Sequence, residues 1–374
     1  IKSECQRLQE DMLAFGKLKA GDVAAVFDGT IDGLIGAYLS DQDSGFQNLR
    51  YKSRETYKKH LKGVSRTVGK RALSEIKGRD FKRWYENWSA NGQHVPRANY
   101  RMTMVRLIVS FGVAILEDPH CIRLNTILAE HSFEGNKKRT ATLTPEQIDD
   151  IRRHARAKDR PGLALGEALK FSLMFRPKDA YGEWIPVSEP GLSAIIRKGM
   201  KWVCGVDWSE VDSAMLLTHR ISKSIRGKRA MADQEAGKTK RFQLTLYPMI
   251  MEELAKMAAV SIQEVRRDLF PASGPMVLNR DTGLPYIETT LRLHWREVAD
   301  LAGVSKKVQG RDARASRATQ AERLGISEDE IRKGLGHARP ETTRIYTRGE
   351  DEVTANIAKI IVAKQAANSV TNKK

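Results

Sequence analysis

Apolar residues recur at steps of three and four along the first third of the chain, the spacing of one helix face. The pattern predicts four helices: at about 31–39, from Ser53 onward, at 78–88, and from Pro96 onward. Helices this closely spaced predict a small all-α domain. We place it at residues 28–131, after a loose helix and connector at 1–27.

The pattern changes after this domain. Residues 132–143 lack apolar periodicity and predict a linker, and Thr144, Pro145 and Gln147 then form a helix-start signature. We predict a mixed domain over 144–349, with strand-like runs at 214–221 and 241–246 separated by a long polar hairpin. Its predicted helices lie at 145–157, 162–174, 248–259, 287–302, 312–325 and 328–335.

A last apolar stripe lies near the end of the chain. Val353, Ile357, Ile360 and Ile361 have helical spacing, which predicts a short amphipathic helix within a tail at 350–374. Such a helix can pack on its own domain or on a neighbouring molecule.

Charge narrows the class of partner. Lys and Arg number 64 against 46 Asp and Glu, a formal net charge of +18, and a polyphosphate is the commonest partner of such an excess. No apolar run is long enough to span a bilayer, and no signal peptide opens the sequence. The chain begins with Ile1 rather than Met, which leaves open whether an N-terminal segment is missing. Three scattered cysteines predict neither disulfides nor a zinc site and fit a reduced cytosolic compartment.

Basic residues concentrate at 50–71, where nine Lys or Arg accompany one acid, Glu55. Most charge runs are simply solvated helix faces. The density and one-sidedness of this run favour instead a surface that follows DNA phosphates. The candidate DNA contacts of the first domain are Arg54, Lys58, Lys59, Lys62, Arg97 and Arg101.

The segment 310–349 holds the strongest candidate chemistry. Arg311 and Arg314 are three apart at the start of a helix rich in alanine, whose small side chains favour close packing around the base of Arg314. A capping box starts the next helix, which ends at Leu335-Gly336-His337. Tyr346 follows nine residues after His337.

These elements, in this order and spacing, resemble the catalytic domain of the tyrosine recombinases, the phage-type integrase family. The resemblance implies an arginine after the second helix of the domain and an acid three positions later, here Arg176 and Asp179. It also implies a lysine on the second strand of a hairpin, for which Lys223 is the best match. Lys228, Lys238 and Lys240 of the same hairpin are the alternatives for this role, and we expect Lys228 and Lys240 to contact DNA.

The implied reaction explains these residue types. Arg176 and Arg314 would clamp the scissile phosphate, His337 would donate a hydrogen bond to it, and Tyr346 would attack the phosphorus. Lys223 would protonate the leaving 5′-oxygen. Asp179 would orient or neutralise an arginine. Neither a metal nor another cofactor is implied.

One position departs from the family pattern. Arg311 stands where the family usually has histidine, and an arginine is protonated at any working pH. Arg311 therefore suits a third positive contact to the phosphate rather than a general base. Which group accepts the proton of Tyr346 stays open.

The resemblance also implies the architecture and the function. We expect a mostly helical α+β chain, with an all-α, SAM-like core-binding domain and a mixed α/β catalytic domain that form a C-shaped clamp on double-stranded DNA. The implied function is site-specific recombination through a 3′-phosphotyrosyl intermediate and a Holliday junction. The active form would be a homotetramer on paired sites that exchanges the tail between protomers, in the cytoplasm of a bacterium or phage host, on the nucleoid. Alternatives are a type IB topoisomerase, a hairpin telomere resolvase, and a catalytically dead DNA-binding accessory protein.

Overall fold

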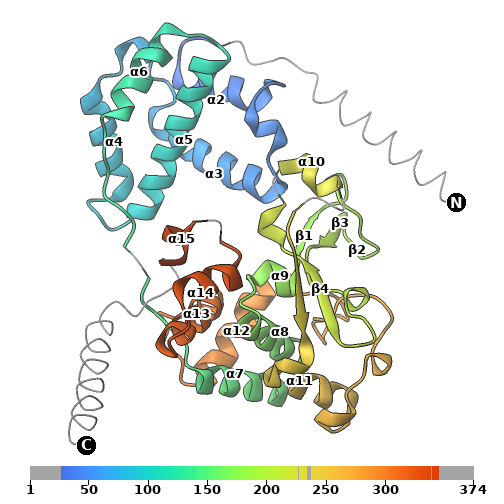
Figure 1. Ribbon diagram of the computed structural model, residues 1–374. Helices are drawn as coiled ribbons and strands as arrows, with labels where there is room; N and C mark the ends of the chain where they lie inside the picture. The colour runs from blue at the N-terminus through green and yellow to red at the C-terminus, as the bar shows by residue number, and fades with distance from the viewer. Residues whose placement is uncertain (1–26, 138, 226, 234–236, 338, 345–374) are drawn as a thin grey trace, which may run out of the picture. The chain divides into compact units, whose positions relative to one another are not determined.

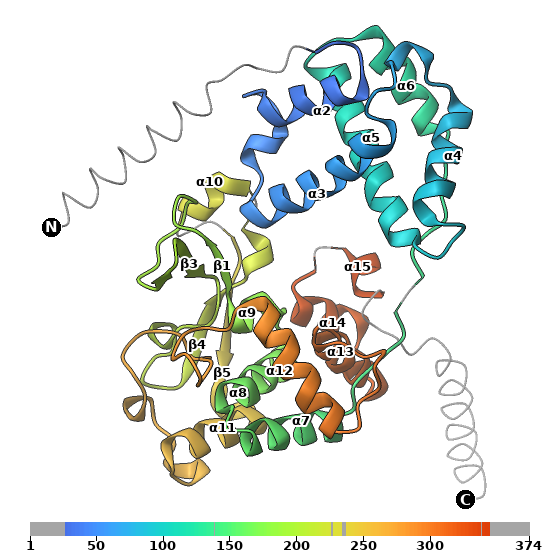
Figure 2. The same ribbon diagram turned by 180° about the vertical axis from the view of Figure 1, so that it is seen from behind.

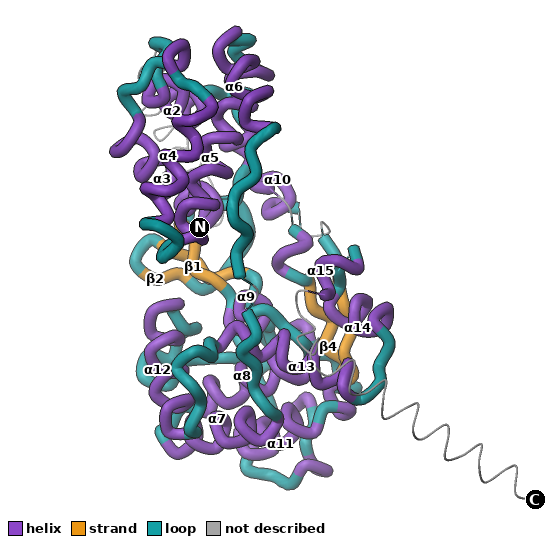
Figure 3. The backbone as a smooth tube through the Cα atoms, turned by 90° about the vertical axis from the view of Figure 1, so that its left-hand side faces the viewer, coloured by secondary structure: helices purple, strands orange, loops and turns teal. Residues whose placement is uncertain are grey.

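The computed structural model describes residues 27–137, 139–225, 227–233, 237–337 and 339–344 (Figure 1). Helices predominate and strands are few (Figure 3). The chain forms two compact units, the first from 1–137, 185–201 and 225–236, and the second from 138–184, 202–224 and 237–374. The mostly helical α+β class expected from the sequence is confirmed.

Residues 27–137 of the first unit contain the four predicted helices and one more. They are α2 (Ile31–Ser40), α3 (Tyr51–Val68), α4 (Gly78–Ser89), α5 (Val95–Ala114) and α6 (Pro119–Ala129). We did not predict α6, which begins at an Asp118 cap and has a narrow apolar stripe. It packs closely on α5, because a Cβ at Gly112 would lie 2.3 Å from the Cys121 sulfur.

The second unit is built around α8 (Pro161–Ser172), whose residues 162–171 are all buried. Helices α7 (Pro145–Ala157), α11 (Pro248–Ala258) and α13 (Ala313–Arg323) pack against it, and α12 (Glu288–Leu301) packs on α7 (Figure 2). The last elements of the described residues are α14 (Glu328–Leu335) and α15 (Pro340–Arg344), which contact each other. A short helix, α9 (Pro177–Tyr181), follows α8.

The predicted hairpin is present, but the connection between its two strands differs from the prediction. Strands β4 (Leu216–Arg220) and β5 (Thr239–Gln243) pair antiparallel, with His219 opposite Lys240. Both are shorter than predicted, since residues 244–246 form a 3-10 turn. The connection is not simply polar loop: it contains the 3-10 turn η4 (Ser222–Ser224) and helix α10 (Gly227–Ala232).

A second sheet escaped prediction. Its order is β1 (Glu183–Pro186), β3 (Met200–Val203), β2 (Ile196–Arg197). These three strands lie before the run at 214–221, which we predicted as the first strand of this domain, and the 3-10 turn Trp208–Glu210 follows them. Strands of two to four residues are too short to show an alternating pattern.

The segment predicted as a linker is attached at both ends. Phe133 stacks on Tyr85 of the first unit, with ring centroids 4.8 Å apart. Arg139 pairs with Asp312 of the second unit, and Leu143 is buried in the core of that unit. In the part of the chain that the structure describes, no helix has the length and apolarity of a membrane span.

Candidate active site

Arg314 is the buried centre of the candidate site. It lies on α13 between Ala313 and Ala315, which are themselves buried, as the small-residue pattern predicted. Its guanidinium donates to the backbone oxygen of Met174 and, over 2.6 Å, to that of Leu335. These bonds fix the guanidinium between the end of α8 and the end of α14, so its position depends on three separate segments.

The imidazole of His337 lies against this guanidinium. Its Nε2 is 3.3 Å from Nη2 of Arg314, and its Nδ1 is 3.2 Å from the hydroxyl of Thr343 on α15. Because a guanidinium can only donate, Nε2 must accept, and Nδ1 then carries the proton that it donates to Thr343. His337 is therefore placed as a neutral imidazole with a defined tautomer.

The charges around His337 enforce the neutral form. Burial and the cations of Arg314, Arg176, Lys223 and Lys240 lower the pKa of His337 to about 4. These four side chains come from α13, the start of α9, η4 and β5. The structure thus gathers residues from distant parts of the sequence into one positively charged site.

Lys240 has an ammonium group that is held by two hydrogen bonds. Its Nζ donates to the backbone oxygens of Lys333 and Gly334, at 3.0 and 2.6 Å, in the last turn of α14. Burial, with Arg314 and Arg176 as further causes, lowers the pKa of Lys240 to about 8. Since Gly336 and His337 follow directly, Lys240 supports the turn that carries the imidazole.

Asp179 joins two elements of the site. The backbone N–H of Arg176 donates to one carboxylate oxygen of Asp179 over 3.1 Å, and that of Ser222 donates to the other over 2.8 Å. Asp179 is fully buried, and Lys223 follows Ser222 in η4. The carboxylate therefore orients the backbone of both basic segments rather than facing the reaction.

Two predicted site residues, Lys223 and Arg311, are placed differently from their expectation. Lys223 is exposed on η4 and is not on a strand. Arg311 is exposed on the 3-10 turn η8 (Gly310–Asp312) and not on the helix with Arg314, because Asp312 caps this turn by accepting from the N–H of Gln309. Tyr346 lies outside the described residues.

The basic positions of the first unit fall into two groups. Arg54 pairs with Glu189, and Arg101 lies over the Trp88 ring at 5.6 Å, so both have internal partners. Arg97 donates to the Trp88 oxygen over 2.9 Å yet is exposed, and three lysines of α3 are exposed as well: Lys58, Lys59 and Lys62. The side chain of Lys228, on α10, lies outside the described residues.

An aromatic pair lies among these cations and was not predicted. His60 of α3 stacks on Tyr100 of α5, with ring centroids 4.5 Å apart and an interplanar angle of 11°. The two residues are 40 positions apart by their numbers, and no sequence motif connects them. Thr343 was also missed, although it lies in the same Thr-Thr-Arg-Ile-Tyr run as Tyr346.

The comparisons with known proteins agree with this geometry. Residues 203–352 match the model described as the phage integrase family. The matched stretch, which contains Lys223, Lys240, Arg314 and His337, is therefore similar to that family, the tyrosine recombinases. None of the curated protein sequences matches the chain significantly.

Solved structures share the fold at low sequence identity. A lambda integrase tetramer bound to a Holliday junction matches with a TM-score of 0.59 and 16% identity, covering 92% of this chain and 86% of that one. A lambda integrase (75-356) dimer bound to a COC′ core site gives 0.58 and 13%, covering 85% and 95%. The Tn1549 transposon integrase with circular intermediate DNA gives 0.52 and 10%, covering 85% and 94%. At such identities the likeness establishes the fold.

Proposed function

We propose that the chain is a site-specific DNA recombinase that breaks and rejoins DNA through a covalent bond to Tyr346. The observation that carries this proposal is the contact between Arg314 and a neutral His337, surrounded by Arg176, Lys223 and Lys240. Such converging donors and cations suit a phosphodiester that gains negative charge in its transition state. The excess of basic residues suits a duplex DNA substrate.

The cleavage step can be written with these side chains. The Tyr346 oxygen forms a bond to phosphorus while the bond from phosphorus to the 5′-oxygen breaks, which leaves a 3′-phosphotyrosine and a 5′-hydroxyl. Arg314 and Arg176 bind the non-bridging oxygens, and Lys223 protonates the leaving oxygen. Attack by the 5′-hydroxyl of another strand reverses the step and conserves the bond energy.

The neutral His337 is a candidate for the group that accepts the proton of Tyr346, a role that Arg311 cannot fill. When a phosphate oxygen takes over the donors of Arg314, the lone pair on Nε2 is released, and the added negative charge raises the affinity of the imidazole for a proton. We propose that His337 accepts the proton of Tyr346 directly or through water, in place of the hydrogen bond to the phosphate that the resemblance implied. Arg311, exposed at η8, then adds only positive charge.

The assembly belongs to the same proposal. The lambda integrase relative was solved as a tetramer on a Holliday junction. We propose that this chain also acts as a tetramer on paired sites, each protomer clamping DNA between its two domains. The amphipathic stripe of 350–374, outside the described residues, would dock on a neighbouring protomer.

A nicked DNA substrate tests the proposal, because loss of the short cleaved fragment traps the covalent adduct. We expect wild-type protein to form an adduct that survives denaturation and is removed by protease, and Tyr346→Phe to bind the DNA without forming it. An adduct with Tyr346→Phe would contradict the assigned nucleophile.

The same assay separates the alternatives. DNA binding without any adduct would identify a catalytically dead accessory protein. Relaxation of supercoiled DNA by a monomer would indicate a topoisomerase, and closed hairpin ends would indicate a telomere resolvase. Exchange of strands between two duplexes would support the recombinase.

A further inference from the structure

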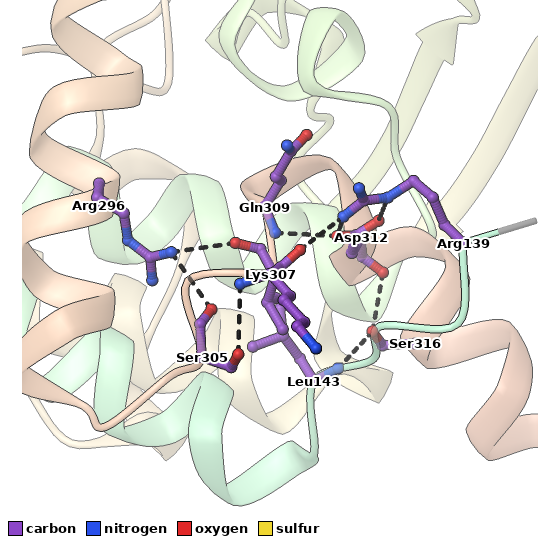
Figure 4. A network of polar contacts seen from close by, with 9 residues as sticks. Arg139, Leu143, Arg296, Ser305, Lys307, Gln309, Asp312 and Ser316 are labelled. Carbon is purple, nitrogen blue, oxygen red and sulfur yellow. Dashed lines mark hydrogen bonds and ion pairs between the residues drawn. The ribbon is translucent and has the colours of Figure 1, made fainter. Parts of the chain in front are cut away.

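The C-terminal half of the linker, residues 139–143, contacts the segment that carries Arg311 and Arg314. Two nitrogens of the Arg139 guanidinium donate to the two carboxylate oxygens of Asp312, at 3.2 and 2.6 Å. Figure 4 shows this pair. Asp312 is buried, and in the sequence it lies between Arg311 and Arg314. A buried carboxylate needs such a partner, and a bidentate pair also fixes its orientation.

A second contact lies on the other side of Arg314. The backbone N–H of Leu143 donates to the Ser316 hydroxyl over 2.8 Å, and that hydroxyl donates to the Asp312 backbone oxygen over 2.8 Å. Arg139 and Leu143 of the linker thus bond to Asp312 and Ser316 (Figure 4). These two residues stand two positions before and two positions after Arg314 in the sequence. The backbone that presents Arg314 is clamped from both sides.

The loop before η8 provides a fixed base for the pair. Arg139 also donates to the Lys307 backbone oxygen over 2.9 Å. Arg296 of α12 holds this loop by donating to the backbone oxygens of Val304 and Val308, at 3.3 and 3.1 Å. Arg139 therefore joins a supported loop to Asp312, rather than two mobile groups.

The N-terminal half of the linker, residues 132–136, forms hydrogen bonds with the first unit. The Asn99 side chain donates to the backbone oxygen of Glu134 and to the side chain of Asn136, at 2.9 and 3.1 Å. Residues 137 and 138 separate Asn136 from Arg139. The bonded residues of the two halves of the linker are therefore close together along the chain.

We propose that Arg139 is a positioning residue for Arg314 and Arg311, which it holds in place through its pair with Asp312. The inference rests on the proposed function. Its physical content is that η8 and the first turn of α13 keep their geometry only while Arg139 pairs with Asp312. Displacement of a catalytic group by about 1 Å can slow a reaction by roughly 100-fold.

Cleavage and binding kinetics of full-length variants test this role. We expect Arg139→Met to slow single-turnover adduct formation by roughly 10- to 100-fold, with the DNA dissociation constant changed by about twofold at most. Arg139→Lys should recover part of the rate, since it keeps the charge but not the bidentate geometry. The matched control is Arg153→Met, which removes an exposed arginine paired with Asp150 on α7 and should cleave like wild type.

A double variant tests whether the two partners act together. Asp312→Asn should slow cleavage about as much as Arg139→Met, and the double variant should be little slower than either. Additive effects would contradict the pairing. Wild-type cleavage by Arg139→Met, or a loss of cleavage that merely follows a loss of DNA affinity, would overturn the proposal.

A readout that needs no cleavage keeps this inference separate from the proposed function. The Nε–H resonance of Arg314, assigned with Arg314→Lys, reports the guanidinium position in protein without DNA. We expect it to shift in Arg139→Met and to stay unchanged in Arg153→Met. If wild type forms no adduct, the proposed function is wrong. If the Arg314 resonance does not shift in Arg139→Met, the positioning role is wrong, whatever the adduct assay shows.

Discussion

Two lysines meet at the site, and their contacts suggest different tasks. Lys240 donates to the last carbonyls of α14, which makes it a support for the His337 turn, whereas Lys223 is exposed and available to a leaving group. We expect Lys223→Met to slow cleavage by roughly 100-fold by removing the proton donor. Lys240→Met should also slow cleavage, because the turn loses its anchor.

The leaving group distinguishes the two lysines. A substrate with sulfur in place of the 5′-oxygen at the scissile phosphate leaves as a thiolate and needs no proton. It should restore cleavage by Lys223→Met and leave Lys240→Met slow. If the sulfur substrate restored cleavage by Lys240→Met alone, Lys240 would be the proton donor and Lys223 would not.

The buried imidazole predicts a pH dependence of stability. The pKa of His337 is about 4 in the folded chain and about 6.5 in an unfolded one, so between these values the unfolded chain binds more protons. The free energy of unfolding should therefore fall as the pH drops from 6.5 to 4, by on the order of 3 kcal/mol from this residue. Below pH 4 the contribution should stay constant.

Denaturant unfolding of wild type and His337→Gln across this range measures the effect. Other groups titrate in both proteins and cancel in the difference. The difference between the two proteins should change steadily from pH 6.5 to 4. Parallel curves for the two proteins would contradict a buried neutral His337.

The sequence singled out residues that the structure brings close together, but it did not predict their contacts. Arg314, His337 and Asp179 were predicted from motifs and their spacing, and the structure buries all three. The supporting contacts were not visible, because Lys240 and Gly334 are 94 residues apart and Arg139 and Asp312 are 173 apart. Pairings at such separation depend on tertiary packing, which periodicity along the chain does not encode.

At the scale of elements, α15 supports the imidazole. Thr343 is fully buried, and its hydroxyl accepts the Nδ1 proton of His337. Thr343→Val keeps the shape but removes this acceptor, which releases the tautomer. We expect cleavage to fall by about tenfold, with the pH profile of cleavage shifted, and DNA affinity maintained.

Thr342→Val is the matched control, since Thr342 is the exposed neighbour on the same helix. Single-turnover cleavage against pH distinguishes the two variants. If both variants behaved alike, the effect would belong to the helix as a whole and not to the bond with His337.

Element boundaries show where pattern reading ends. The long helices were predicted because an apolar stripe repeats over three or more turns, as in α5 and α7. Helix α10 and the sheet β1-β3-β2 were missed because their elements are two to six residues long. The turn η8 was merged with α13, since a capped 3-10 turn and the start of a helix have the same residue preferences.

At the scale of the whole molecule, the net charge of +18 predicts how DNA binding responds to salt. Each phosphate neutralised by a lysine or arginine releases condensed counterions, so affinity should fall steeply with salt concentration. Exposed residues such as Lys58, Lys59 and Lys62 should set the slope. Arg54 and Arg101, which have internal partners, should contribute less to the slope than these three.

Deletion of residues 350–374 tests whether the tail joins protomers. Burial of its apolar stripe against a second protomer would contribute only when two copies are present, so the truncated protein should bind a single site normally. It should form fewer two-site complexes and Holliday junctions in a gel shift with paired sites. A variant with the stripe residues Ile357, Ile360 and Ile361 changed to serine should reproduce the defect at unchanged length. Equal loss of single-site and paired-site binding would instead indicate that the tail packs on its own domain.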